Sequence, residues 1–156
     1  MCRLFPKVNV VTISDTASTD PSNAERTGTA LLTALGDMIE EYELLAEVRG
    51  RGLMIGLEFG KPRSLKLRPG WSMLQTARVG LFAQMVVVAL FQRHRILTQV
   101  SGDHTEVIKL LPPLMIGDEE VALFREAFDD VMKDAHKGSG LMWDFGRTLV
   151  KQAVNR

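Results

Sequence analysis

The first clear hydrophobic pattern lies in residues 21–42, downstream of a short β-branched stretch at 8–13 and a polar loop. Asp20 and Pro21 favour a helix start at this point. The pattern predicts a helix over residues 21–42, although Gly28 and Gly36 lower its helix propensity. Apolar side chains recur there at the three- and four-residue spacing of one helix face, at Ala30, Leu31, Ala34, Leu35, Met38 and Ile39.

Residues 47–59 show the period of a strand instead. The turn Gly50-Arg51-Gly52 follows Val48 and permits a tight reversal of the chain. A phosphate-binding glycine loop would require a helix after its glycines, whereas a strand follows here. The segment therefore predicts a β-hairpin. The apolar residues of its second strand occupy every second position, at Leu53, Ile55, Leu57 and Phe59.

Further elements follow from the same criteria. Residues 60–70 are basic and rich in turn formers, which predicts a loop, and residues 71–93 predict a long, largely buried helix. Short strands are expected at 96–100 and 106–111, the second ended by Pro112 and Pro113, which cannot donate to a strand ladder. A helix beginning at Asp118 and a short helix at 141–154 complete the chain. This order predicts a two-layer α+β domain with a small, mainly antiparallel sheet and helices on one face.

The composition narrows the classes of function. Of the 156 residues 46% are hydrophobic, and 19 basic side chains balance 19 acidic ones. Without net charge, no long-range field directs the protein to nucleic acid or to an anionic membrane. The single cysteine excludes an internal disulfide, which favours the reducing cytoplasm, and no signal peptide is expected. The apolar run at 79–91 suits a buried helix better than a membrane span.

Few residues are candidates for chemistry. His94, His104 and His136 lack the close spacing of metal ligands, so no metal site is expected. Lys109 stands between Ile108 and Leu110 in a predicted strand, and alternation places its side chain on the face opposite to theirs. Two interpretations of Lys109 remain open: a solvated lysine on the exposed face of a half-buried strand, or a cation that binds a carboxylate.

Two segments resemble the class III aminotransferases, the ornithine and acetylornithine aminotransferase group. Their order along the chain and the separation between them also match that family. The first is the hairpin from Val48 to Glu58, VRGRGLMIGLE. The second runs from Glu106 to Leu114, EVIKLLPPL, and is followed by an acidic helix start at Asp118. Residues 23–35 also look like the helix that precedes the hairpin in this family.

The resemblance implies the carboxy-terminal small domain of a fold-type I transaminase. It covers residues 23–137 as that domain, leaves residues 1–22 unmatched, and sets residues 138–156 apart as a helical tail. Such enzymes hold pyridoxal phosphate on a lysine of their large domain and move an amino group between an amino acid and a keto acid. No catalytic or cofactor-binding residue is expected in this chain, and pyridoxal phosphate is not expected to bind the chain alone.

The resemblance also assigns substrate binding to Lys109. In the ornithine-type enzymes this strand position carries an arginine that binds a substrate carboxylate. Lysine offers a point charge in place of the planar guanidinium fork, so a carboxylate is bound less directionally.

The resulting hypothesis is a carboxy-terminal fragment of a class III aminotransferase that positions substrate and is inactive by itself. Its expected partners are the substrate, the large domain and the second subunit of a homodimer. The alternative is a stand-alone, non-catalytic ligand-binding or interaction module derived from that domain. The unmatched residues 1–22 favour a truncated gene, a misplaced start or an incomplete sequence.

Overall fold

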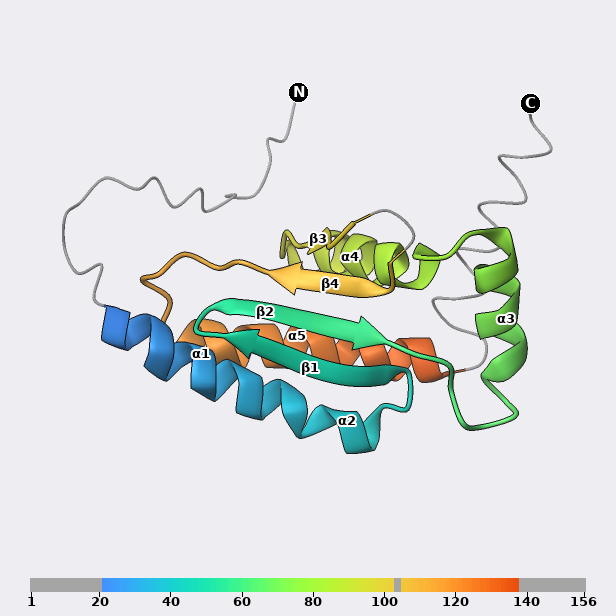
Figure 1. Cartoon of the computed structure of the whole chain (residues 1–156), viewed down its shortest axis with the longest axis horizontal. Helices are drawn as coiled ribbons and strands as arrows, with labels where there is room; N and C mark the ends of the chain where they lie inside the picture. Colours follow the sequence, from blue (N-terminus) through green and yellow to red (C-terminus); the bar gives the residue numbers. More distant parts are fainter. Residues whose placement is uncertain (1–20, 103–104, 138–156) are drawn as a thin grey trace, which may run out of the picture.

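The computed structural model describes residues 21–102 and 105–137 (Figure 1). The predictions for residues 8–13 and 141–154 lie outside the described residues. In chain order the elements are α1 (Pro21–Gly36), α2 (Met38–Glu41), β1 (Leu45–Arg51), β2 (Met54–Phe59), α3 (Arg68–Ala77), α4 (Leu81–His94), β3 (Gln99–Val100), β4 (Val107–Leu110) and α5 (Asp118–His136).

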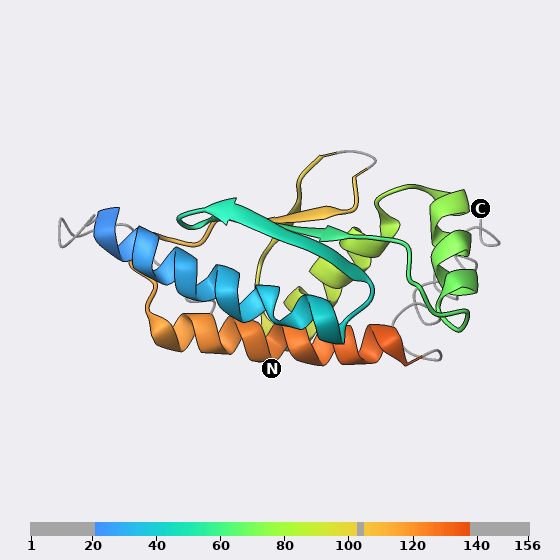
Figure 2. The same cartoon turned by 60° about the horizontal axis from the view of Figure 1, so that its bottom comes forward.

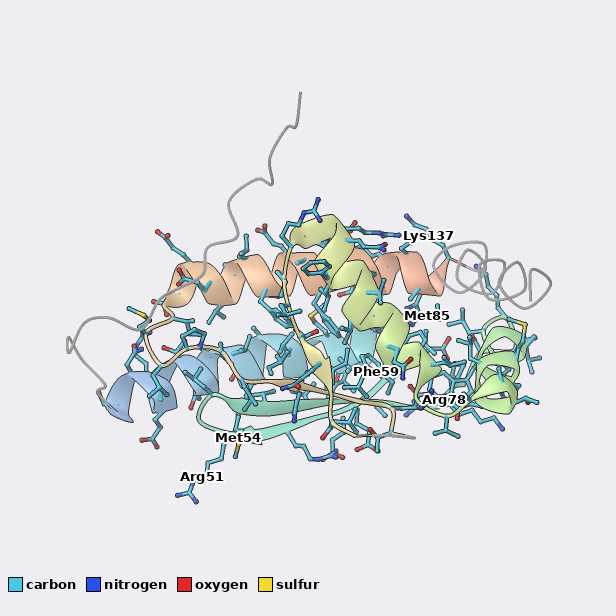
Figure 3. All side chains as sticks on the ribbon, turned by 90° about the horizontal axis from the view of Figure 1, so that it is seen from above. Arg51, Met54, Phe59, Arg78, Met85 and Lys137 are labelled. Carbon is cyan, nitrogen blue, oxygen red and sulfur yellow. The ribbon has the colours of Figure 1, made fainter. Side chains whose placement is uncertain are left out.

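The strands form one antiparallel sheet in the order β1-β2-β4-β3. Helices α1 and α4 lie against one face of this sheet, and α5 packs against both of them on the side away from the strands (Figures 2 and 3). Helix α3 lies beyond one end of the sheet (Figure 1). The other sheet face carries no described helix, and we call it the open face. The arrangement confirms the predicted α+β fold with helices on one face.

The core fills the space between the sheet and the helices. The ring of Phe59 meets Phe82 of α4 edge to face at 5.0 Å between centroids, and Phe128 of α5 at 6.4 Å. Burial of apolar surface of this kind stabilises the domain by about 25 cal/mol per Å². The strand residues that point into the core alternate with outward-facing ones, as predicted for the hairpin, and are Ile55, Leu57, Phe59, Ile108 and Leu110.

The single helix predicted at 71–93 is in fact two helices, α3 and α4, separated at Gly80 with a φ of 90°. The carboxylate of Glu106 accepts hydrogen bonds from the N–H groups of Gly80 at 2.8 Å and of Ala83 at 2.9 Å. These bonds satisfy donors at the amino end of α4, where a helix lacks internal partners. The prediction was wrong because a residue distant in sequence supplies a new helix start. Helix α3 also begins inside the predicted loop, at Arg68.

Two other boundaries differ from the prediction. The helix at 21–42 is interrupted at Asp37, which keeps helical φ and ψ angles of −60° and −26°. The strand expected at 96–100 is reduced to Gln99–Val100. Residues 95 and 96 end α4 instead: Arg95 takes a left-handed φ of 60°, and the N–H of Ile96 donates to the carbonyl oxygen of Leu90 at 3.2 Å. This is how a helix end satisfies its free carbonyl groups.

Within residues 21–102 and 105–137 no single helix is both long and apolar enough to cross a membrane. Helices α3 and α4 meet that requirement of length and composition only as a pair, bent by 102°. Helix α4 is largely buried in the core.

Candidate functional site

Lys109 lies in the middle of the sheet. It is in β4, opposite Gly56 of the neighbouring strand β2 on one side and opposite Gln99 of β3 on the other. Its neighbours Ile108 and Leu110 are buried against the helices. Because successive strand side chains alternate, the half-buried side chain of Lys109 belongs to the open face.

A transverse row of residues crosses the open face at the level of Lys109. The register places Arg49 of β1 opposite Gly56, Gly56 opposite Lys109, and Lys109 opposite Gln99. Side chains of directly opposed residues lie on the same face of an antiparallel pair. Arg51, further along β1, points away from the helices in the same direction (Figure 3).

Gly56 leaves an opening in this row between the two cations. A Cβ atom at Gly56 would meet a side-chain carbon of Val107 at 3.6 Å and the carbonyl oxygen of Arg49 at 3.8 Å, which are ordinary contacts. The position therefore has room for a side chain but carries none.

The charges of the open face are distributed unequally. The guanidinium of Arg49 donates to a carboxylate oxygen of Glu47 at 2.9 Å and also bonds the carboxylate of Glu58. The bond to Glu58 and the charge of Glu47 raise the pKa of Arg49 above its usual value. Lys109, by contrast, forms no hydrogen bond or ion pair with any other described side chain. No described side chain therefore occupies its ammonium group.

A hollow of about 270 Å³ opens beside the end of β4. Residues of α1, the segment before β3, the segment after β4 and α5 form it, and Lys109 is among the residues that line it. The rim is apolar and exposed at Leu97, Leu111 and Leu123. Sequence reasoning missed this hollow, because its walls come from four separate stretches of the chain and no motif connects them.

The residues beside the hollow do not favour the phosphate group of pyridoxal phosphate. Helix α5 begins beside the hollow, and its first turn carries Asp118, Glu119 and Glu120. These carboxylates complement the positive end of the helix dipole, but they repel a phosphate. Of the described lysines, all except Lys109 are exposed to solvent, whereas a Schiff-base lysine is activated by desolvation or a neighbouring cation.

Each of the two described histidines has a hydrogen-bond partner in the protein. His94 contacts Asp130 at 3.0 Å across α4 and α5, and Nδ1 of His136 lies 2.8 Å from the carbonyl oxygen of Met132. His104 lies outside the described residues.

Known proteins share both the sequence pattern and the fold of this chain. The model of the family "Aminotransferase class-III" matches residues 10–132. Aminotransferase PigE of a Serratia species is 29% identical, over 70% of this chain and 16% of that protein. A leucine/methionine racemase of Thermococcus litoralis is 31% identical, over 74% of this chain and 23% of that protein.

Solved structures share the fold. A thermostable omega transaminase mutant from Pseudomonas jessenii superposes with a TM-score of 0.59 at 22% identity, over 74% of this chain and 23% of that one. The Pseudomonas jessenii omega transaminase in complex with PMP gives a TM-score of 0.57 at 23% identity, over 72% of this chain and 22% of that one.

The chain spans 16% to 23% of the length of these curated relatives. The family match, which covers most of the chain, agrees with the resemblance seen in the hairpin and in the strand that carries Lys109. The chain belongs to the class III aminotransferase family.

Proposed function

We propose that this chain forms the substrate-side domain of a pyridoxal-phosphate-dependent aminotransferase and that Lys109 binds a carboxylate of the substrate. The observation that carries the proposal is the state of Lys109. It is half-buried at the centre of the open face and has no anionic partner among the described residues. A lysine that served only solubility would not need this central position.

The partner that completes the site is a large domain covering the open face. The relatives extend far beyond the part that this chain matches, because the match covers less than a quarter of each. On this proposal the large domain holds the cofactor and supplies the chemistry, residues 23–137 act as the small domain, residues 138–156 form an appended tail, and two such subunits form a homodimer.

Lys109 contributes binding and orientation to such a site. A charge-assisted hydrogen bond between an ammonium group and a carboxylate is shorter and stronger than a neutral one. Covering the open face removes water and strengthens the contact further. A substrate held in this way is oriented toward the reacting group, which lowers the entropic part of the barrier.

Replacing Lys109 in the complete enzyme that contains this domain tests the proposal. Lys109→Ala removes a contact worth about 1.5–3 kcal/mol, so kcat/KM is expected to fall roughly ten- to a hundredfold. Lys109→Arg is expected to keep much of the activity, because the guanidinium fork suits a carboxylate. Lys66→Ala, at an exposed lysine in the segment between β2 and α3, serves as the control. Unchanged kcat/KM for several carboxylate substrates in Lys109→Ala would identify Lys109 as a solvated strand residue.

The hollow beside β4 favours a second candidate function. It is formed within the described residues and has an apolar rim, as a ligand-binding module acting without a large domain requires. A chain that stays monomeric at high concentration and binds a small apolar molecule in the hollow would support this alternative. Self-association through uncovered apolar surface supports the domain of a larger enzyme.

A further inference from the structure

Glu58 is placed to compete with a substrate for Lys109. It lies on the open face of β2, two residues beyond Gly56, and is opposite Val107 in β4. Lys109 is opposite Gly56, so Glu58 and Lys109 are diagonal neighbours on the same face. Such neighbours are about 7–8 Å apart at their backbones, within reach of long side chains.

Arg49 of β1 is also a diagonal neighbour of Glu58, on the side of β2 that faces away from β4. It is opposite Gly56 from the β1 side, while Glu47 is opposite Glu58. The carboxylate of Glu58 therefore has a cation at each diagonal. In the structure it bonds Arg49, and it forms no bond to Lys109.

Two features favour the bond of Glu58 to Arg49 over a bond to Lys109. Its guanidinium presents several donors in a rigid fork, whereas lysine presents a mobile point charge. Arg49 is also bonded to Glu47 at 2.9 Å, which fixes its side chain between the two carboxylates. The three residues form a cluster along β1 and β2, with both carboxylates bonded to Arg49.

We propose that Arg49 is a positioning residue that keeps Glu58 away from Lys109, so that the ammonium group of Lys109 remains available to the substrate carboxylate. This inference rests on the proposed function of Lys109. When Arg49 is removed, Glu58 loses its partner and turns to the remaining diagonal cation, Lys109. An incoming carboxylate then has to displace Glu58.

Binding of butyrate to the full 156-residue chain, followed by NMR at the amide signals of Gly56 and Lys109, tests this inference. Arg49→Ala is expected to weaken butyrate binding about two- to fivefold, because butyrate then competes with a partly exposed ion pair between Glu58 and Lys109. The double variant Arg49→Ala with Glu58→Gln is expected to restore binding, because the competing carboxylate is gone. Arg49→Lys is expected to retain most of it.

Arg51→Ala is the matched control, because Arg51 carries the same charge on the open face of β1 but lies opposite Met54. It is expected to change butyrate binding less than Arg49→Ala does. If the double variant binds as weakly as Arg49→Ala, Arg49 does not act through Glu58 and the inference is overturned.

Lys109→Ala separates the inference from the proposed function. Loss of butyrate binding in Lys109→Ala together with unchanged binding in Arg49→Ala overturns the inference alone. Butyrate binding that is unchanged in Lys109→Ala overturns the proposed function of Lys109 itself. The thermal unfolding of every variant is measured alongside, and Arg49→Lys replaces Arg49→Ala if the latter does not fold.

Discussion

Gly28 in the middle of α1 lies against Gly52 at the turn of the β1–β2 hairpin. A Cβ atom added to Gly28 would stand 2.2 Å from the carbonyl oxygen of Gly52 and 2.8 Å from its Cα. The obstacle is backbone, and Gly52 itself has a φ of 54° in the left-handed region. The glycine that weakens the helix locally is therefore what lets α1 approach the hairpin.

Overpacking this closed contact costs about 1–3 kcal/mol, and the better helix propensity of alanine offsets about 1 kcal/mol of that cost. Gly28→Ala is therefore expected to destabilise the chain by up to about 2 kcal/mol. Urea unfolding measures the change. Gly36→Ala is the control in the same helix, because a Cβ atom at Gly36 meets nothing within 4 Å. That variant is expected to be equally or more stable than the unsubstituted chain. Equal stability of both alanine variants would show that α1 can move away from the hairpin at little cost.

The hydrogen bond between Tyr42 and Asp129 predicts that the stability of the folded chain changes with pH in the alkaline range. The phenol of Tyr42 is buried and donates to Asp129 at 2.5 Å, and Asp129 also accepts from Lys133 at 2.5 Å. Burial and the Asp129 carboxylate hold the pKa of Tyr42 well above its usual value. In the unfolded chain the phenol loses its proton near pH 10. Since the folded state holds the proton more tightly, the free energy of unfolding is expected to fall as pH rises above about 10.

The chain contains a single tyrosine, so the phenolate absorbance reports Tyr42 alone. Its titration midpoint is expected at higher pH in the folded chain than in urea. Tyr42→Phe is expected to lose about 1–2 kcal/mol at neutral pH and to lose less stability than the unsubstituted chain above pH 10. A phenolate midpoint that is the same with and without urea would contradict this account.

Asp129 is expected to make the stability of the folded chain depend on pH in the acidic range. Burial opposes its ionisation, but the hydrogen bonds from Lys133 and Tyr42 outweigh burial and hold the pKa of this carboxyl below its usual value. The stabilisation is present above the unfolded pKa of about 4 and is lost as pH falls through the folded pKa. Asp129→Asn is expected to flatten the acid limb of the stability curve, measured by urea unfolding from neutral to acidic pH.

Glu106 connects the sheet to the start of α4. Its side chain accepts from two backbone N–H groups and from the amide of Gln75 at 2.5 Å. Glu106→Ala is expected to destabilise the chain by about 2 kcal/mol, because buried donors at the helix start lose a charged acceptor. Glu126→Ala, at an exposed position of α5, is expected to change stability by less than about 0.5 kcal/mol. Both are measured by thermal and urea unfolding.

Pyridoxal phosphate is expected not to form a stoichiometric internal aldimine with this chain. The acidic first turn of α5 repels its phosphate, and the lysines other than Lys109 are exposed in the described part of the chain. Absorbance after mixing, followed by borohydride reduction and peptide mapping, measures the reaction. Reduction onto one specific lysine at one cofactor per chain would show that the cofactor site is within this chain.

Local sequence determined the type of most elements among the described residues, though not all their boundaries, and which strand face is apolar. The alternation of Leu53, Ile55, Leu57 and Phe59 predicted the buried face of β2, because a side-chain period of two follows from backbone geometry alone. The same rule placed the side chain of Lys109 on the sheet face away from Ile108 and Leu110. Family-like segments in the hairpin and around Lys109 pointed to the fold for the same reason, since they are local patterns.

Tertiary structure decided where elements break and which residues meet. The carboxylate of Glu106 caps a new helix at Gly80 and so divides the expected long helix in two. The apolar periodicity of residues 71–93 cannot indicate a capping group that comes from a distant segment of the chain. The row formed by Arg49, Gly56 and Lys109 depends on the register of β1, β2 and β4. A shift of one residue would turn every side chain of a strand to the other face. The register of β2 against β4 arises from packing between segments about 50 residues apart, so it cannot be deduced from either segment alone.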